Sequence, residues 1–406
     1  MARLKVVDLF SGAGGMSYGF KSRSDIFEIV GAIDFEKGKP GRGKSPGSST
    51  GCNPTYERNI GLRPKSADIL TLSPAQYRAE LGLSTGELSV LISCAPCTGF
   101  SQKNATNHTT DDPRNQLVER TADFVAEFRP EFLVMENVKE LLNGTQRHHF
   151  ENLRDRLENE LGYKVWAEIH DFADFGLPQR RRRALLIARR DGPVIGLPTP
   201  KCGVRTVREA IGHLPAIRGG ECHQDDPMHV APSNTPAVLA RIKAIPHDGG
   251  SWADVMNAPN LSEAEKRSLL TPAMFRARPG SFPDVYGRLW WDRPAITITR
   301  ECGHVGNGRY THPEQDRLLS VREMALLQGF PSDYYFEGPT AAKYNQIGDA
   351  VPPAISKLVA NHIARMTTEE GDIYDQLLSC DHQLLLNLNE RNEIYVSAPL
   401  LDETGS

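Results

Sequence analysis

The chain has 406 residues, of which 39% are hydrophobic and 24% charged, and its formal net charge at pH 7 is −4. The composition is typical of a globular protein, excludes an apolar run long enough to span a bilayer, and gives no bulk charge that would indicate nucleic acid binding. The seven cysteines have no regular spacing, so we expect neither a disulfide framework nor a metal site. The first residues predict a short strand rather than a secretory signal, so we expect a cytoplasmic protein.

Short apolar runs alternate with amphipathic segments over the first half of the chain. The runs are rich in β-branched residues and are bounded by polar residues, glycine or proline, which predicts buried strands at 4–10, 29–34, 88–93, 132–136, 165–172 and 184–188. Apolar residues at helical spacing predict helices at 117–128 and 150–161. Strands that alternate with helices predict an α/β fold with a mostly parallel sheet covered on both faces.

The alternation is lost further along the chain. Residues 37–51 form a Gly-, Ser- and Pro-rich surface insertion, and residues 193–283 show no strong period, which indicates a smaller irregular domain. Helices are predicted again at 318–328, 353–366 and 374–388. We therefore expect a first domain at 1–192, a second domain with its return segment at 193–317, a part at 318–366 that completes the first domain, and a tail of unassigned role at 367–406.

A glycine-rich loop, Asp8-Leu9-Phe10-Ser11-Gly12-Ala13-Gly14-Gly15, follows the first predicted strand. Glycines let the backbone approach a ligand closely, and the next helix N-terminus adds positive potential, although a simple tight turn would need the same residues. The loop lacks the GxGxxG spacing of dinucleotide folds. Asp34 ends the second strand, where Rossmann-like sheets bind a ribose, and Asp68 lies where a third strand should end; both are also common turn residues.

Two further strand ends carry reactive side chains. The fourth strand ends in Ser93-Cys94-Ala95-Pro96-Cys97, and the fifth ends in Glu136-Asn137-Val138. Open α/β sheets place reactive groups at the carboxyl ends of their strands, so Cys97 and Glu136 would face one crevice. Taken singly, Cys97 could be an inert buried thiol and Glu136 an ion-pair partner. The four consecutive arginines at 180–183 could bind phosphate or form a solvated face.

In this order, the segments resemble the motif series of the DNA cytosine-5 methyltransferases of the bacterial restriction–modification type. The resemblance covers roughly residues 4–190 and 286–365 and rests on Phe-Ser-Gly-Ala-Gly-Gly, Pro-Cys, Glu-Asn-Val, Gln179-Arg180-Arg181-Arg182-Arg183, Leu327-Gln328-Gly329-Phe330-Pro331 and Gly348-Asp349-Ala350-Val351-Pro352. It implies a Rossmann-like methyltransferase sheet with a smaller target-recognition domain. It also implies methyl transfer from S-adenosyl-L-methionine to carbon 5 of a cytosine flipped out of double-stranded DNA.

The resemblance implies a role for each catalytic residue. The thiolate of Cys97 would add to carbon 6 of cytosine and make carbon 5 nucleophilic. Glu136 would hydrogen-bond or protonate ring nitrogen 3, and Arg183 would bind the carbonyl oxygen of the base. Arg181 would organise the site or reach a phosphate.

The resemblance also implies the binding residues. For the cofactor these are Phe10, Gly12, Gly14, Asp34, Phe35, Asp68, Ile69 and Asp349. For DNA they are Ser101 in the polar stretch at 101–114, Gln179 and Arg181. Four residues are as plausible for DNA contact as for a structural role: Trp252, Arg276, Arg278 and Arg288.

The sequence departs from the family pattern at two positions. Thr98 stands where the family usually has Gln, and Asp349 stands where it usually has Asn, which adds charge near the cofactor. A tRNA methyltransferase of the same fold and a catalytically inactive DNA-binding relative are the alternatives. The long recognition segment argues against the first, and the presence of the nucleophile and cofactor loop argues against the second. We expect a monomer whose cognate endonuclease, if any, is separate.

Overall fold

The computed structural model describes residues 2–36, 49–96, 111–198, 203–277 and 282–367. Cys97, Thr98, Ser101 and Arg278 lie outside these ranges, as do most of the insertion at 37–51 and the helix expected at 374–388. No helix among the described residues combines the length and apolar character needed to cross a membrane.

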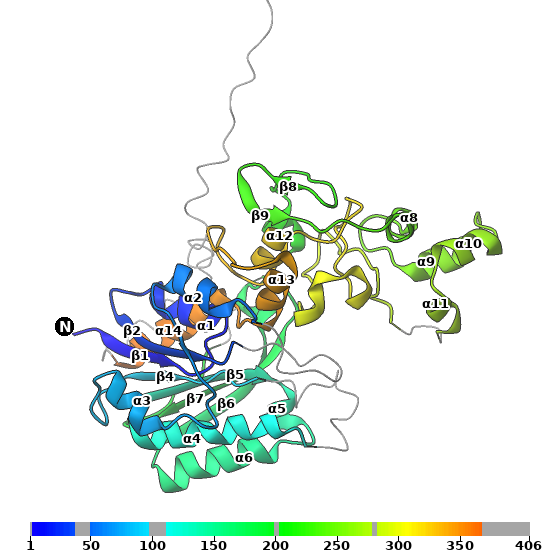
Figure 1. The fold of residues 1–406 in the computed structure, drawn as a ribbon. Coiled ribbons are helices and arrows are strands. Elements are labelled where there is room, and N and C mark those ends of the chain that lie inside the picture. The colour runs from blue at the N-terminus through cyan, green and yellow to red at the C-terminus, as the bar shows by residue number, and fades with distance from the viewer. Residues whose placement is uncertain (1, 37–48, 97–110, 199–202, 278–281, 368–406) are drawn as a thin grey trace, which may run out of the picture.

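The core of the molecule is a seven-stranded sheet with the order β3-β2-β1-β4-β5-β7-β6 (Figure 1). Its strands are β1 (Leu4–Asp8), β2 (Phe27–Asp34), β3 (Lys65–Ser66), β4 (Val90–Ile92), β5 (Phe132–Val138), β6 (Lys164–Asp171) and β7 (Arg182–Arg189). The strands from β3 to β5 pair in parallel, whereas β7 runs antiparallel to both β5 and β6. The predicted α/β fold with a mostly parallel sheet is confirmed, and the antiparallel β7 is an addition to it.

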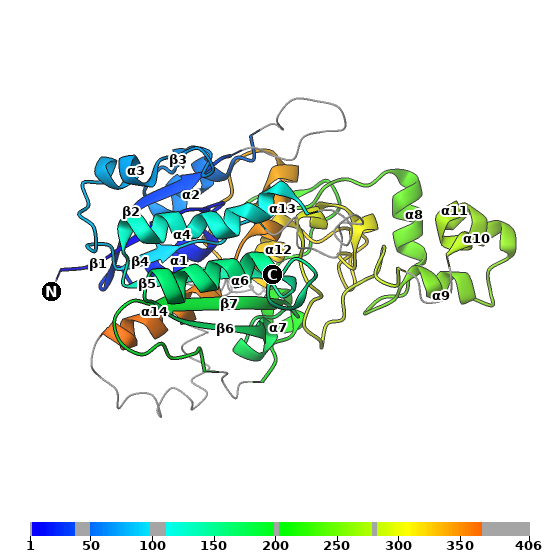
Figure 2. The same ribbon diagram turned by 90° about the horizontal axis from the view of Figure 1, so that it is seen from below.

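Helices cover both faces of the sheet. On one face lie α3 (Pro74–Glu80), α4 (Gln116–Phe128) and α6 (His148–Asp155), and Figure 2 shows α4 and α6 side by side across the strands. The helix expected at 150–161 is α6 followed by a π-helical turn, Arg156–Glu160. On the other face, α1 (Gly15–Lys21) packs against α14 (Pro353–Thr367). Apolar side chains of α4, such as Phe124, Val125 and Phe128, are fully buried, because their helical spacing places them on one face of the helix.

A second core lies beyond the carboxyl edge of the sheet. It is built from α7 (Val207–Ile211), β8 (Cys222–His223), β9 (Asp226–Val230), α8 (Pro236–Ala244), α9 (Trp252–Asn257), α11 (Pro272–Arg276), α12 (Val321–Leu327) and α13 (Thr340–Asp349), with α10 (Glu263–Leu269) beside α8. Figure 1 shows α8 to α11 farthest from the sheet. The side chains of α12 and α13 belong to this second core, whereas those of α14 belong to the sheet. The segment 318–366 thus contributes to both cores, and the expected domain boundary between residues 317 and 318 stays a prediction.

The contact between α1 and α14 allows no side chain at Gly19. A Cβ atom added there would lie 2.2 Å from both the carbonyl carbon and Oγ of Ser356. The Ser356 hydroxyl also donates a hydrogen bond to the Met16 carbonyl oxygen, which holds the two helices at this separation.

We expect Gly19→Ala to lower the free energy of unfolding by about 1–3 kcal/mol, because a well-packed helix contact must separate to admit the methyl group. Urea unfolding followed by circular dichroism measures the change. Gly203→Ala is the matched control, since nothing lies within 4 Å of its added Cβ. Equal midpoints for the two variants would contradict the steric role of Gly19.

Candidate active site

A buried carboxylate lies at the end of β5. Glu136 is 7% exposed, and Arg183 of the neighbouring β7 places its Nε 3.3 Å from Glu136 Oε1. Burial raises the pKa of Glu136 above its usual range, and the charges of Arg183 and Arg181 only partly oppose this. Among the described residues, Oε1 accepts no well-aligned hydrogen bond. A carboxyl group with a raised pKa and unused hydrogen-bonding capacity can donate a proton or a hydrogen bond to a ligand.

The loop that leads to Cys97 is attached to this same end of β5. The Asn137 side chain donates a hydrogen bond from Nδ2 to the Ala95 carbonyl oxygen at 3.1 Å, and the Glu136 amide lies 3.4 Å from Cys94 Sγ. Burial raises the pKa of the Cys94 thiol well above its ordinary value, so Cys94 is a poor nucleophile. Cys97 and Ser101 themselves lie outside the described residues, and their expected roles stay predictions.

Gln179 does not face a DNA-binding surface, which corrects the expectation of a direct contact. The residue is completely buried, and its Nε2 donates hydrogen bonds to Gln328 Oε1 at 2.7 Å and to the Leu327 carbonyl oxygen at 3.2 Å. Its Oε1 accepts a hydrogen bond from the Ile298 amide at 2.9 Å. Because the amide is satisfied by protein groups, Gln179 ties the strand ends to α12 rather than presenting a group to DNA.

Arg181 is likewise a buried structural link. Its side chain is 3% exposed and donates hydrogen bonds to the carbonyl oxygens of Ile298 at 2.9 Å and Ala350 at 3.1 Å. Of the two expectations for Arg181, organising the site agrees with this burial, and a phosphate contact does not. Its positive charge still lowers the pKa of Glu136, so it contributes to the electrostatics of the site.

The glycine-rich loop and Asp34 meet at the ends of β1 and β2. Gly12 has φ of +48°, and its amide donates a hydrogen bond to Asp34 Oδ2 at 3.0 Å. The other oxygen of Asp34 accepts a hydrogen bond from the Glu36 amide at 2.6 Å. A Cβ added to Gly12 would meet nothing within 4 Å, and the buried hydroxyl of Ser11 forms no hydrogen bond with the described residues. Open space beside a carboxylate and an unused hydroxyl fits the ribose of a nucleoside cofactor.

The other expected cofactor residues differ in burial. Phe35 follows Asp34 and is 45% exposed, whereas Phe10 is half-buried against the core. Asp68 accepts a hydrogen bond from the Leu70 amide at 3.0 Å, and Ile69 is buried beside it. Gly14, with φ of +92°, ends the loop; a Cβ there would lie 2.9 Å from the Tyr334 hydroxyl.

Asp349, which stands where the family usually has Asn, forms an ion pair. Arg300 Nη1 contacts Asp349 Oδ2, so the extra negative charge has a positive partner from a distant part of the chain. Burial raises the pKa of the nearby Cys52 thiol, and Asp34 and Asp349 raise it further. Asp34 and Asp349 are thus both close to Cys52, a residue that the sequence did not single out.

Three of the four recognition residues of undecided role lie within the described residues, and they differ in burial; Arg278 lies outside them. Arg288 is fully buried, and its guanidinium bonds to four carbonyl oxygens and to Asp316. Trp252 is 7% exposed and donates its indole hydrogen bond to the Phe282 carbonyl oxygen at 3.0 Å. Both are structural residues. Arg276 is exposed and remains a candidate for DNA contact.

Comparison with known proteins agrees with this geometry. A family profile described as C-5 cytosine-specific DNA methylase matches residues 4–365. Type II methylase M.HgiDII of Herpetosiphon aurantiacus is 33% identical over 368 residues, which cover 89% of this chain and 95% of the relative. Type II methyltransferase M1.HphI of Haemophilus parahaemolyticus is 32% identical over 370 residues, covering 90% and 88%. The solved structure of the Entamoeba histolytica methyltransferase EhMeth shares the fold, with a TM-score of 0.60, 14% identity and coverage of 91% and 100%.

The fold and site therefore define a methyltransferase that uses S-adenosyl-L-methionine. The chain belongs to the C-5 cytosine-specific DNA methylase family, and its activity is that of a DNA (cytosine-5) methyltransferase.

Asp8 is a titratable group below the cofactor loop for which the sequence indicated no role. It is 1% exposed and accepts a hydrogen bond from the Ser17 hydroxyl at 2.7 Å, and Tyr56 in turn donates to Ser17. Burial raises the pKa of Asp8 to about 7, against the opposing hydrogen bonds from Ser17 and the Phe10 amide. The folded protein thus holds a proton that the unfolded chain releases near pH 4, so the stability linked to this proton is lost as pH rises through 7.

We expect Asp8→Asn to remove this pH dependence, because the neutral amide needs no proton to remain buried. Between pH 4 and pH 8 the free energy of unfolding of the wild type should fall relative to that of Asp8→Asn by an amount on the order of 4 kcal/mol. Urea unfolding at several pH values measures it. Asp191→Asn, at an exposed carboxylate, should follow the wild type. Parallel pH profiles for the wild type and Asp8→Asn would refute the buried proton.

Proposed function

We propose that the chain methylates cytosines within one short sequence of double-stranded DNA, through a covalent adduct with Cys97, as the modification enzyme of a restriction–modification system. The observation that carries the proposal is the buried Glu136, which has a raised pKa, lies beside Arg183, and belongs to the strand end that holds the loop leading to Cys97. The relatives named as type II methylases support the biological role. We further propose that the protein acts as a cytoplasmic monomer without a stable endonuclease complex.

S-adenosyl-L-methionine, when bound, supplies an electrophilic methyl group on a sulfonium. The open space at Gly12, the carboxylate of Asp34 and the unused hydroxyl of Ser11 would hold its ribose, with Phe35 and Asp68 toward the adenine. In the wider pocket Arg300 compensates the charge of Asp349.

The protein residues make carbon 5 of cytosine reactive. Cys97 as a thiolate adds to carbon 6, and the electron pair moves through the ring toward nitrogen 3 and the carbonyl oxygen. Protonated Glu136 donates to nitrogen 3, and Arg183 stabilises the charge that develops on the oxygen. After carbon 5 is methylated, loss of its proton restores the double bond and expels Cys97. Arg181, which is buried against Ile298 and Ala350, positions this end of β7.

We expect Glu136→Gln to keep DNA binding but to slow single-turnover methyl transfer by about 10²–10⁴-fold, since the amide cannot deliver a proton to nitrogen 3. Rapid-quench assays with saturating DNA and cofactor measure this rate. Glu168→Gln, on the exposed side of β6, is the control and should retain the wild-type rate. A wild-type single-turnover rate in Glu136→Gln would remove this carboxyl group from the mechanism.

Bisulfite sequencing tests the proposed specificity and the nucleophile together. In plasmid DNA from a naive host that expresses the chain, we expect protected cytosines within one recurring short sequence. The same plasmid encoding Cys97→Ser should yield none, while the purified variant still binds S-adenosyl-L-methionine. Protection spread over unrelated sequences would contradict a specific modification enzyme, and protection by Cys97→Ser would contradict the adduct. Wild-type protein that methylates only cellular RNA would contradict the DNA substrate.

A further inference from the structure

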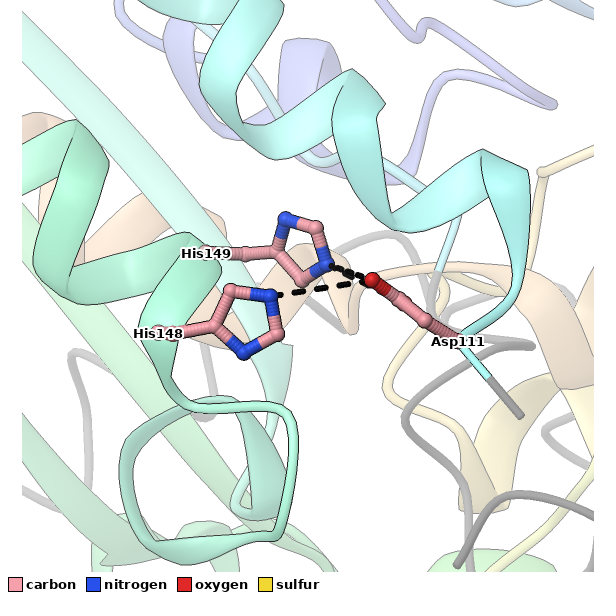
Figure 3. A group of neighbouring side chains, drawn as sticks. All are labelled: Asp111, His148 and His149. Carbon is pink, nitrogen blue, oxygen red and sulfur yellow. Dashed lines mark hydrogen bonds and ion pairs between the residues drawn. The ribbon is translucent and has the colours of Figure 1, made fainter. Parts of the chain in front are cut away.

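Three side chains gather at the entry to two neighbouring helices, and one of them, Asp111, belongs to the polar stretch at 101–114. His148 and His149 begin α6, and Asp111 lies just before the 3-10 turn Pro113–Asn115 that leads into α4 (Figure 3). Their ligand atoms all lie within 4.8 Å of one another, and they form a group of a kind found nowhere else among the described residues. We propose that Asp111, His148 and His149 form a binding site for a zinc ion.

The separations between the ligand atoms suit one small divalent cation. Asp111 Oδ2 lies 2.9 Å from His149 Nε2 and 3.6 Å from His148 Nε2. Tetrahedral zinc with nitrogen and oxygen ligands at about 2.0–2.1 Å places neighbouring ligand atoms about 3.3–3.5 Å apart. The three ligand atoms lie within 4.8 Å of one another, so side-chain adjustment toward this spacing would bring them into one coordination sphere. A fourth position remains for water, because Asp111 and His148 are exposed.

Two of the ligands are oriented by further hydrogen bonds, as metal ligands in proteins commonly are. Glu119 Oε1 lies 2.5 Å from His149 Nδ1, so in the tautomer that carries its hydrogen on Nδ1 the Nε2 atom is left to face Asp111. Asn115 donates a hydrogen bond from Nδ2 to Asp111 Oδ1 at 2.7 Å, which leaves Oδ2 directed at the two imidazoles. His149 is itself buried, so its ring has little freedom to turn away.

The hydrogen-bond inventory also favours a cation at this place. His149 lies between two carboxylates, at Glu119 and Asp111, and His148 brings a second imidazole to the same Asp111 oxygen. A divalent ion shared by the three ligand atoms would compensate the negative charges that surround these imidazoles.

The chemistry of the ligands selects zinc over the common hard cations. Two imidazole nitrogens and one carboxylate oxygen suit zinc, whereas magnesium and calcium take oxygen ligands almost exclusively. A bound ion would connect the starts of α4 and α6, which already pack together on one face of the sheet. None of the three ligands is among the residues that we propose for methyl transfer, and no spacing in the sequence predicted a metal site here.

Isothermal titration calorimetry tests the site on the full-length, tag-free protein after chelator treatment, with zinc chloride as the titrant. We expect one equivalent of zinc per chain and an increase in melting temperature on binding, because the ion binds only the folded arrangement. His148→Gln and Asp111→Asn should each weaken zinc binding at least tenfold. His247→Gln, at an exposed histidine outside the group, should bind zinc as the wild type does.

Two further measurements distinguish zinc bound at the proposed site from zinc bound to other residues of the chain. His148 is exposed, so His148→Gln should fold even if Asp111→Asn does not, and circular dichroism reports this. Cobalt substituted for zinc should show no thiolate-to-metal charge-transfer band, since the proposed ligands include no cysteine. The proposal is overturned if the wild type binds no zinc saturably, if His148→Gln binds zinc as tightly as the wild type, or if the thiolate band appears.

Discussion

The ion pair between Glu136 and Arg183 depends on the direction of one strand. In the parallel part of the sheet, the carboxyl ends of the strands lie at one edge, where the cofactor loop and the loop leading to Cys97 emerge. β7 runs antiparallel to β5, so its first residues lie at that same edge, with Arg183 paired in register with Val138. A parallel strand in this place would carry the arginines to the opposite edge. The antiparallel strand therefore brings a fixed positive charge to a buried carboxyl group that would otherwise be isolated.

The same edge is held in place from the second core. Gln179 and Arg181, immediately before β7, are fixed by backbone groups of Leu327, Ile298 and Ala350. These hydrogen bonds are buried, so they help to determine where β7 starts and hence where Arg183 lies. The late motifs of the chain thus act on the catalytic edge through buried hydrogen bonds, although they lie far from it in sequence.

Local sequence patterns predicted six of the seven strands of the sheet and the helices α4, α6, α12 and α14, but neither α13 nor the direction of β7. The run at 184–188 is apolar and short whether it pairs in parallel or antiparallel, because burial on both faces gives the same pattern. The helices of the second core, such as α7 and α11, have five residues each and are too short to show a helical period. The motif order singled out Glu136 and Arg183, and the structure shows that they are neighbours. The sequence did not show that Gln179 and Arg181, in the same run, are held by buried hydrogen bonds within the protein. Arg288 and Trp252 were undecided for the same reason: a long polar or aromatic side chain suits an interface and an interior equally well until its partners are known.

The pairing of Asp349 with Arg300 shows how a departure from a family pattern can be accommodated. Asp34 and Asp349 both act on the pKa of Cys52, so an unpaired carboxylate at 349 would add like charge to this region. Arg300 lies in the segment that packs against Gly348, where an added Cβ would be 2.2 Å from the Thr299 carbonyl oxygen, so the guanidinium is carried to Asp349 by a close backbone contact. The pair therefore adds no net charge to the cofactor region. Burial raises the pKa of Asp34 although it accepts hydrogen bonds from the Gly12 and Glu36 amides, and Asp34 forms no ion pair with the described residues. A cofactor that brings a positive sulfonium and two ribose hydroxyls is suited to that environment.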